Sequence, residues 1–355
     1  MSTPHREDVR DDGQGSRLLN DFAWPARIAL CAALGLATAA NITALLVPFM
    51  EIREFLHKTE SYELPEAVKL MWTEGLPVVA VLIVSFSIVF PFAKLLGLAI
   101  CLLPRWRRRE RRARMLRLLA ELGRWSLLDV FVVMLLMVLA SDQWAVGTDV
   151  KPGIYLFMSA IGTAMAVSDV LASRAEALEP TKSGQAERSR AIARLGWFGR
   201  IGLPLLLLAS FATLVGAIGT PFLKIEQFLL RGYSYSVFGA IRTLWESHRE
   251  VFATLMALLL AALPAVRLVL LAVALAAKAS DAVRSGLLHW AGLARRWSGI
   301  EVFGLALLLV LVEGRSLIKT EVLSGAWILL GAIAANTALT FAFSRLVRGI
   351  RGGTA

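Results

Sequence analysis

Charged residues are scarce in this chain, and cysteine and histidine are scarcer still. Of the 355 residues, 18% are charged, four are histidine and two are cysteine. Cys31 and Cys101 stand far apart and no Cys-x-x-Cys occurs, so the sequence does not support a zinc ribbon, a thioredoxin-like motif or a metal site. The sequence also lacks a phosphate loop, a Gly-x-Ser-x-Gly elbow and a His-Glu-x-x-His motif. We therefore expect no enzyme activity, no cofactor and no metal.

Apolar residues, in contrast, make up 57% of the chain. They gather in recurring stretches of about twenty residues, each long enough to cross a bilayer core of roughly 30 Å. This pattern predicts an all-α transmembrane protein. The formal net charge of +11 could suggest a nucleic-acid partner. However, no basic patch with interleaved aromatic residues occurs on a soluble segment, so we expect a membrane and no nucleic acid.

The apolar stretches predict eight helices in two groups of four. Residues 27–173 form the first four-helix membrane repeat, and residues 197–346 form the second. A cytoplasmic tail (1–26), a linker (174–196) and a second tail (347–355) flank them. The predicted spans are 27–49, 76–103, 125–141, 153–173, 197–222, 251–277, 297–317 and 325–346.

Lysine and arginine concentrate in the tails, the linker and the segments 105–124 and 278–296. By the positive-inside rule these are cytoplasmic loops, and both termini are cytoplasmic. The polar segments 50–75 and 223–250 then lie outside. Each contains apolar residues at helical spacing, which indicates a short amphipathic helix. That helix either lies in the outer membrane interface or packs on the loops as an ordinary surface helix.

One motif occurs twice in the sequence. Residues 124–131 read RWSLLDVF and residues 296–303 read RWSGIEVF, and each copy opens an apolar run. Further matches, such as Pro48 with Pro221, keep nearly the same offset of about 172 residues. Both groups of four spans begin and end on the same side. The sequence therefore predicts two parallel repeats related by an axis along the membrane normal.

Two cations and two acids lie inside the apolar runs, namely Lys94 and Asp129, with Arg267 and Glu301 at the matching places. An unpaired charge at that depth costs about 3 kcal/mol or more, so we expect Lys94 to pair with Asp129 and Arg267 with Glu301. Three interpretations stay open. The charges form a polar site that binds a head group or titrates a proton, they form structural ion pairs, or the acids lie at the membrane interface.

Other polar features in the predicted spans accompany these charges. Pro91 and Pro264 stand three residues before the cations, and each frees a backbone carbonyl that a polar group must satisfy. Asn41 and Asn336 are expected to hydrogen-bond neighbouring helices. Asp169 is expected to be solvated at the inner end of the fourth span. We add Asn41 and the two prolines to the four charges as the candidate lipid-binding site or polar network.

These motifs resemble those of the paraquat-inducible protein A family of bacterial inner-membrane proteins. The family's Trp-Ser-Met-Leu-Asp-Val-Phe run resembles residues 125–131 and, in diverged form, residues 297–303. Its Pro-Gly at the entry to the fourth span resembles Pro152 and Gly153, whereas the second copy lacks the proline before Gly325. The resemblance covers nearly the whole chain beyond residue 26.

Two further family features resemble parts of the first repeat. An Ala-Asn pair followed by proline resembles Ala40, Asn41 and Pro48, and a Pro-x-x-Lys resembles Pro91 and Lys94. Many members also carry two cytoplasmic zinc ribbons of Cys-x-x-Cys pairs, and this chain has none. The role of those ribbons is therefore lost here or supplied elsewhere.

The resemblance implies lipid traffic in the cell envelope. Such proteins resemble membrane subunits that pass phospholipid between the inner membrane and a periplasm-spanning MCE-domain partner, and their four-span unit is described as similar to tetraspanin and claudin-like folds. Our first hypothesis is this transport, with proton coupling through Asp129 or Glu301 as an extension of it. The second is a non-transporting membrane scaffold or regulator of an envelope complex. A membrane enzyme or redox protein is a third and weaker interpretation.

Overall fold

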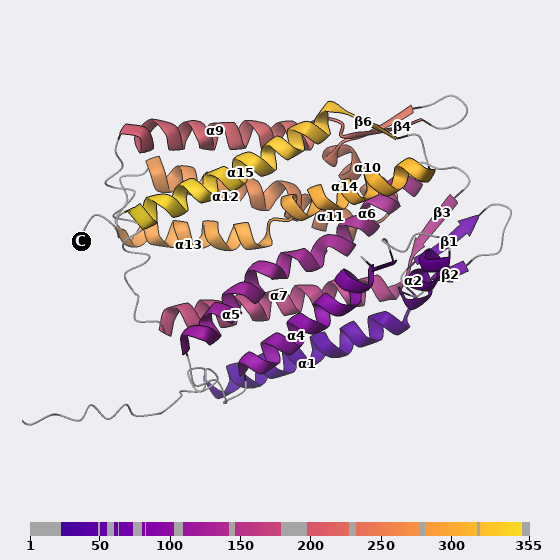
Figure 1. The fold of residues 1–355 in the computed structure, drawn as a ribbon, viewed down its shortest axis with the longest axis horizontal. Helices are drawn as coiled ribbons and strands as arrows, with labels where there is room; N and C mark the ends of the chain where they lie inside the picture. Colours follow the sequence, from indigo (N-terminus) through magenta and orange to yellow (C-terminus); the bar gives the residue numbers. More distant parts are fainter. Residues whose placement is uncertain are drawn as a thin grey trace, which may run out of the picture.

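A computed structural model describes residues 23–48, 50–54, 60–62, 64–73, 80–81, 83–102, 109–141, 146–178, 197–226, 232–276, 281–317 and 320–349. Long helices run beside one another along the longest axis of the molecule (Figure 1). The first helix begins and the last helix ends at the same end of this bundle, which we call the termini end. Two small sheets lie at the opposite end, the sheet end. The chain is an all-α transmembrane protein, as predicted.

The first half of the chain contains most of the helices drawn in indigo and magenta. Its helices are α1 (Trp24–Leu46), α2 (Leu64–Thr73), the π-helical segment η2 (Val84–Val89), α4 (Phe90–Leu102), α5 (Arg109–Leu122), the 3-10 segment η3 (Gly123–Leu127), α6 (Leu128–Ser141) and α7 (Pro152–Leu178). Its strands are β1 (Met50–Glu54), β2 (Glu60–Tyr62) and β3 (Val146–Val150).

The second half repeats this order of elements. Its helices are α9 (Trp197–Gly219), α10 (Val237–Glu246), α11 (Glu250–Ala257), the π-helical segment η4 (Leu258–Ala262), α12 (Leu263–Ala276), α13 (Asp281–Trp297), α14 (Ile300–Leu317) and α15 (Ser324–Gly349). Its strands are β4 (Leu223–Glu226), β5 (Gly232–Tyr235) and β6 (Thr320–Val322).

Equivalent elements of the two halves lie at an almost constant spacing along the chain. Helices α1 and α9 both begin with tryptophan, both have 23 residues, and start 173 positions apart at Trp24 and Trp197. Helices α7 and α15 start 172 positions apart, at Pro152 and Ser324. We therefore call two residues equivalent when they lie 173 positions apart up to the end of α12, and 172 positions apart beyond it.

Seven helical stretches of the described chain are long and apolar enough to cross a membrane. One of them, Arg111–Leu139, joins α5 to α6. The prediction that 105–124 is a loop was therefore wrong for its described part, whereas its cytoplasmic side stays a prediction. The reason is an apolar face on α5, where Ala113, Leu116 and Ala120 are buried and the helix packs on α7. Likewise, α13 stands where a loop was predicted over 278–296, and it packs on α12.

Helix α14 is not among those seven stretches. It has 18 residues, and Glu301, Glu313 and Arg315 all lie within it. The predicted count of eight spans therefore stays a prediction. The predicted tail over 1–26 and the linker over 174–196 lie largely outside the described residues, although α1 already begins at Trp24 and α7 continues to Leu178.

The sheet end holds two three-stranded antiparallel sheets, with orders β2-β1-β3 and β5-β4-β6. Sequence analysis predicted no strand there. Each strand has only three to five residues, and the central strand of each sheet pairs with a segment nearly a hundred residues away. Such short, non-local pairings leave little periodic signal in the sequence.

Helix α10 combines features of both alternatives predicted for the outer segments. It buries Val237, Ala240 and Leu244 and packs on α6, α9 and α11, as a surface helix would. Its Phe238 and Trp245 side chains are exposed. Aromatic side chains in such positions are typical of the membrane interface. The predicted amphipathic helix is therefore present, with Val237 buried and Trp245 exposed.

Two prolines and two glycines join the helices to the sheets in the same way in each half. The Gly153 N–H donates to the Pro48 carbonyl at 3.2 Å, and the Gly325 N–H donates to the Pro221 carbonyl at 3.0 Å. A Cβ at Gly153 would lie 2.7 Å from the Pro48 carbonyl oxygen. Backbone cannot easily move away, so only glycine fits here. This proline–glycine contact thus joins the start of α7 to the end of α1 in the first half, and the start of α15 to the end of α9 in the second.

Each proline in the second helix of a half follows a π-helical segment. Segment η2 precedes Pro91, and η4 precedes Pro264. A proline ring collides with the carbonyl four residues earlier, and a widened turn relieves that collision. The widened turn of the first half contains the buried Ser87.

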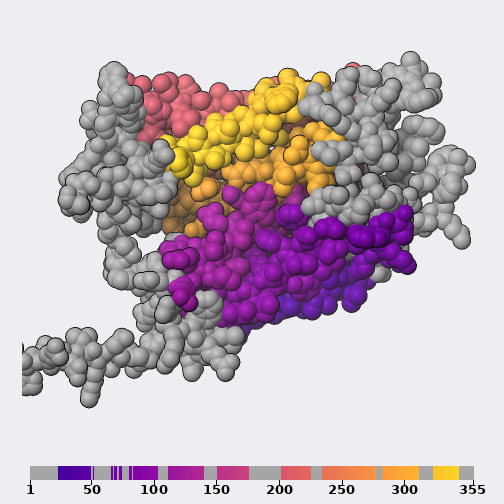
Figure 2. All heavy atoms as spheres, in the orientation of Figure 1, coloured from indigo at the N-terminus to yellow at the C-terminus, as the bar shows by residue number. Residues whose placement is uncertain are grey.

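The two halves pack together through their equivalent helices α6 and α14. The equivalent residues Phe131 and Phe303 meet edge to face, with ring centroids 5.7 Å apart. A Cβ at Gly299 would lie 2.5 Å from the Phe131 ring, so glycine makes room for this ring. The halves remain in contact along the face drawn in Figure 2, where magenta atoms of the first half meet orange atoms of the second.

Candidate functional site

Lys94 lies on the buried face of α4, in the interior of the first half. Ser87, Pro91, Lys94, Leu98 and Cys101 are all buried, and this spacing places them along one face of η2 and α4. The Lys94 side chain is only 3% exposed. Its ammonium lies beside Gly123, where a Cβ would come within 2.8 Å of Nζ. Among the described residues, no group accepts a hydrogen bond from this ammonium.

Asp129, on the first turn of α6, has a different partner from the one predicted. The Ser87 hydroxyl donates a hydrogen bond to its carboxylate, while the second carboxylate oxygen has no partner within the described chain. The predicted ion pair between Lys94 and Asp129 was therefore wrong. The residue of the second helix that reaches Asp129 is Ser87, in the π-helical segment η2.

Asp169 on α7 is the acid that acts on Lys94 electrostatically. It is 8% exposed, so the prediction that it is solvated was wrong. The Trp297 indole N–H donates to one of its oxygens at 2.7 Å, and Arg296 donates to the other at 3.3 Å. Both donors belong to the second copy of the repeated motif. Trp297 thus hydrogen-bonds a carboxylate of the other half.

Ser87, Lys94, Asp129 and Asp169 together form what we call the Lys94 cluster. Two further buried side chains of the first half, those of Asn41 and Ser126, also have no hydrogen-bond partner in the part of the chain described here. The interhelical hydrogen bond predicted for Asn41 is therefore not found. The first half accordingly holds several buried polar atoms that could accept or donate bonds to a guest molecule.

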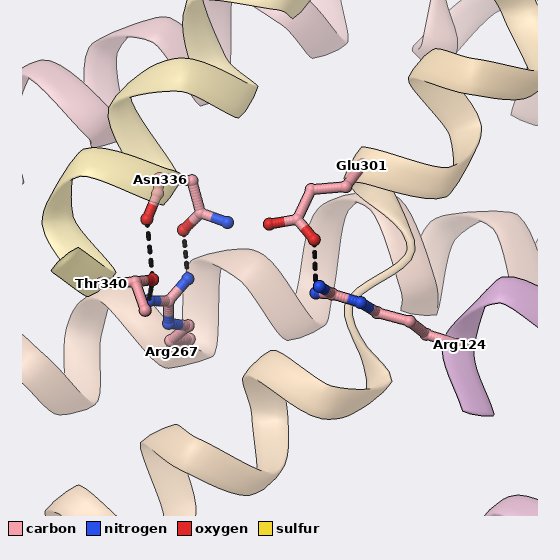
Figure 3. Close-up of polar contacts among 5 residues, drawn as sticks. All are labelled: Arg124, Arg267, Glu301, Asn336 and Thr340. Carbon is pink, nitrogen blue, oxygen red and sulfur yellow. Dashed lines mark hydrogen bonds and ion pairs between the residues drawn. The ribbon is translucent and has the colours of Figure 1, made fainter. Parts of the chain in front are cut away.

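Arg267, the second-half equivalent of Lys94, has partners on α15 (Figure 3). Its guanidinium donates to the Asn336 side-chain oxygen and, at 2.7 Å, to the Thr340 hydroxyl. The interhelical hydrogen bond predicted for Asn336 is confirmed. The Arg267 guanidinium therefore already has two acceptors within the protein.

Glu301 pairs with Arg124, which belongs to the first copy of the motif. The predicted ion pair between Arg267 and Glu301 was wrong, although Glu301 lies near enough to act on Arg267 electrostatically. In Figure 3 a dashed line joins Glu301 to Arg124, while the dashed lines from Arg267 lead to Asn336 and Thr340. Sequence reasoning had assumed that each half pairs its own charges. The signal it missed was the arginine that opens both motif copies.

The two motif copies therefore reach across to each other. Arg124 of the first binds Glu301 of the second, and Arg296 and Trp297 of the second bind Asp169 of the first half. Each bridge joins partly buried charges, which strengthens it relative to a surface pair. The halves are consequently one structural unit at the level of the Lys94 cluster.

Comparison with known families decides where this arrangement belongs. A sequence model of paraquat-inducible protein A matches residues 28–175 and again residues 202–346. The chain belongs to the paraquat-inducible protein A family. The two matched segments coincide with the two halves, so the family unit occurs twice. In these comparisons, neither a curated protein nor a solved structure matches the chain.

Several residues of the site lie in the motifs that resemble those of the family. The Pro-x-x-Lys of this family member supplies Pro91 and Lys94, and its Trp-Ser motif supplies Asp129 and, in the second copy, Trp297 and Glu301. Within the described residues, no three histidine, cysteine or acidic side chains come together in a way that could hold a metal.

Proposed function

We propose that this protein is the inner-membrane subunit of an envelope lipid-transport system. It passes phospholipid between the bilayer and a periplasm-spanning MCE-domain partner. Membership of the paraquat-inducible protein A family supports a membrane protein of the cell envelope, and the family resemblance supplies the expectation of lipid transport. Both termini face the cytoplasm in this proposal, and the sheet end faces the partner.

The observation that carries the proposal is the buried ammonium of Lys94. A lysine ammonium has three donors, and none of them finds an acceptor among the described residues. Leaving such a charge unpaired in a membrane protein costs about 3 kcal/mol or more. A phospholipid phosphate offers the missing acceptors, because charge-assisted bonds to phosphate are strong.

The surroundings of Lys94 suit a transient guest better than a permanent partner. Asp169 supplies a nearby negative charge, but its two oxygens bind Trp297 and Arg296 instead of the ammonium. A phosphate can therefore approach Lys94 without first displacing a hydrogen bond of that ammonium. Entry of the guest then breaks no existing ion pair of Lys94.

Photo-crosslinking in cells tests this proposal. A photoreactive residue at Leu95, which is 5% exposed, should capture phospholipid only if lipid enters the first half. The neighbouring Leu96, 61% exposed, is the control for ordinary bilayer lipid. We expect capture at Leu95 to fall to the background level in Lys94→Met and to persist in Arg267→Met. Capture at Leu95 that is indifferent to Lys94→Met would contradict a head-group role.

The runner-up is a non-transporting scaffold, and the bridges between the halves favour it. Two sets of contacts, Arg124 with Glu301 and Asp169 with Arg296 and Trp297, hold the halves together as a scaffold would require. A scaffold should keep its function in Lys94→Met, because this variant leaves both bridges between the halves intact. A transporter should lose phospholipid transfer in the same variant while remaining folded.

A further inference from the structure

An apolar groove of about 480 Å³ lies between α9 and α12 in the second half. These helices pack on each other (Figure 1). The groove runs along α9 from Pro204 to Phe211, and along α12 from Leu268 to Ala276. At 1.5 Å rise per residue it is about 10–12 Å long. It reaches the last residue of α12, so it occupies the half of the membrane at the termini end.

Large and small side chains line different parts of the groove. Leu208 and Phe211 on α9 and Val269 on α12 are exposed large side chains that form its walls, while Ala272 and Ala276 leave the space between them. The equivalents of Leu208 and Phe211 in the first half are Gly35 and Thr38. Helix α1 therefore lacks the tall apolar walls that α9 provides.

Every residue that lines the groove lies within an apolar membrane-spanning stretch, Ile201–Gly219 or Glu250–Ala276. The surrounding medium is therefore the hydrocarbon of the bilayer. A flexible acyl chain matches an apolar groove about 10–12 Å long in polarity. None of the described residues that line it is charged or polar, so the groove offers no group that could bind a head group.

We propose that this groove binds one acyl chain of a phospholipid from the leaflet at the termini end, as the entry site for the transported lipid. This inference rests on the proposed function, since it gives the tail of the cargo a place. Lipid tails are as apolar as leucine, so hydrophobicity alone does not favour the groove over open bilayer. The advantage comes from van der Waals contact with walls on both sides of the chain.

Native mass spectrometry of the whole protein released from nanodiscs tests the binding. The nanodiscs contain phosphatidylethanolamine and phosphatidylglycerol. Ala272→Trp fills the groove, and Ala99→Trp at the equivalent position of the first half is the matched control, since both alanines are half-buried. We expect the wild type and Ala99→Trp to retain one phospholipid, and Ala272→Trp to retain several-fold less. Equal retention by all three proteins would overturn the inference.

Photo-crosslinking at equivalent exposed positions gives a second readout. Val269 is 54% exposed and Leu96 is 61% exposed. In the wild type we expect several-fold more phospholipid capture at Val269 than at Leu96. In Ala272→Trp we expect capture at Val269 to fall to the yield at Leu96. Equal yields in the wild type would identify ordinary bilayer lipid and overturn the inference. A dimer that Ala272→Trp dissociates would also overturn it, because a second copy of the chain would then occupy the groove.

Phospholipid transfer to acceptor vesicles separates the groove from the Lys94 cluster. Ala272→Trp should slow transfer several-fold, and Ala99→Trp should not. Retained lipid without any effect of Ala272→Trp on transfer would overturn the entry role. The Lys94→Met protein could retain its phospholipid while no lipid is captured at Leu95. This result would contradict the proposed function and would leave the groove as a lipid-binding site.

Discussion

Lys94 and Arg267 occupy equivalent places in the two halves, yet only Arg267 has acceptors among the described residues. Its partners Asn336 and Thr340 correspond to Ala164 and Ser168 in the first half. Alanine has no side-chain acceptor. The Ser168 and Thr340 hydroxyls both donate to the carbonyl four residues earlier, but only the Thr340 hydroxyl also accepts from its cation. The Arg267 site therefore has an asparagine acceptor that the Lys94 site lacks, and its cation is an arginine in place of a lysine.

At three other equivalent positions the polar residue lies in the first half. Leu214 stands where the first half has Asn41, Leu260 where it has Ser87, and Phe341 where it has Asp169. At these three positions the second half has an apolar residue where the first half has a buried polar one, whereas Asn336 and Ala164 differ in the opposite sense. We propose that the first half carries the polar site and that the buried charges of the second half hold helices together.

The largest effect is expected when the bridge between the halves is broken. Arg124→Met leaves Glu301 without its cation in a partly buried place. Removing one partner of a buried pair costs about 3–5 kcal/mol of unfolding free energy. Arg111→Met, at an exposed position of α5, is the surface control.

Denaturant unfolding in detergent measures this cost, and a double variant sharpens the result. Arg124→Met with Glu301→Met should recover much of the lost stability, because no unpaired charge remains. A single variant as stable as Arg111→Met would show that the bridge does not hold the halves together.

Removal of the Asn336 side chain should produce the next largest effect. Asn336→Ala deprives the buried Arg267 guanidinium of an acceptor and should lower stability by about 2–3 kcal/mol. The reverse change, Ala164→Asn, offers Lys94 an acceptor and should raise the melting temperature while reducing lipid capture at Leu95. If Ala164→Asn left lipid capture intact, the open site around Lys94 would not matter for function.

The junctions between helix and sheet should respond alike in both halves. Gly153→Ala and Gly325→Ala each place a Cβ against backbone carbonyls, and such overpacking costs about 1–3 kcal/mol. Gly162→Ala and Gly331→Ala, which meet nothing within 4 Å, are the matched helix controls. Thermal unfolding of the four variants measures the difference. A strong loss in only one half would show that the two junctions are not equivalent.

The smallest change in stability is expected when the first half is made to resemble the second at its π turn. Ser87→Leu copies Leu260 and removes the hydrogen bond to Asp129. The loss of this hydrogen bond should cost about 1 kcal/mol. Phospholipid transfer should nevertheless fall markedly, since the Lys94 cluster loses a member. Full transfer activity in this variant would remove Ser87 from the working site.

Much of the fold was accessible from sequence because apolar runs and duplicated motifs encode it directly. The repeated RWS motif and the apolar stretches predicted a transmembrane helical protein with repeated halves. The helix α5 and the strands of both sheets were not predicted. A basic helix with one buried apolar face resembles a loop when only charge is counted, and strands of three to five residues carry almost no periodicity.

The charge partners could not be predicted because they depend on how the halves pack. Sequence reasoning selected Lys94, Asp129, Arg267 and Glu301, and the structure places all four in buried or half-buried positions. It paired them within each half, whereas Glu301 pairs with Arg124 across the interface. The distance from Arg124 to Glu301 along the chain gives no hint of that contact. Only the packing of α6 on α14 brings these side chains together.

The paired neutralisation of Lys94 and Arg267 tests the central claim most directly, with phospholipid transfer and melting temperature measured on the same preparations. Our account predicts a crossover. Lys94→Met should abolish transfer and leave the melting temperature unchanged or higher, because an unpartnered buried charge is removed. Arg267→Met should lower the melting temperature and retain most of the transfer. Equal loss of transfer in both variants, or loss only in Arg267→Met, would contradict the assignment of the polar site to the first half.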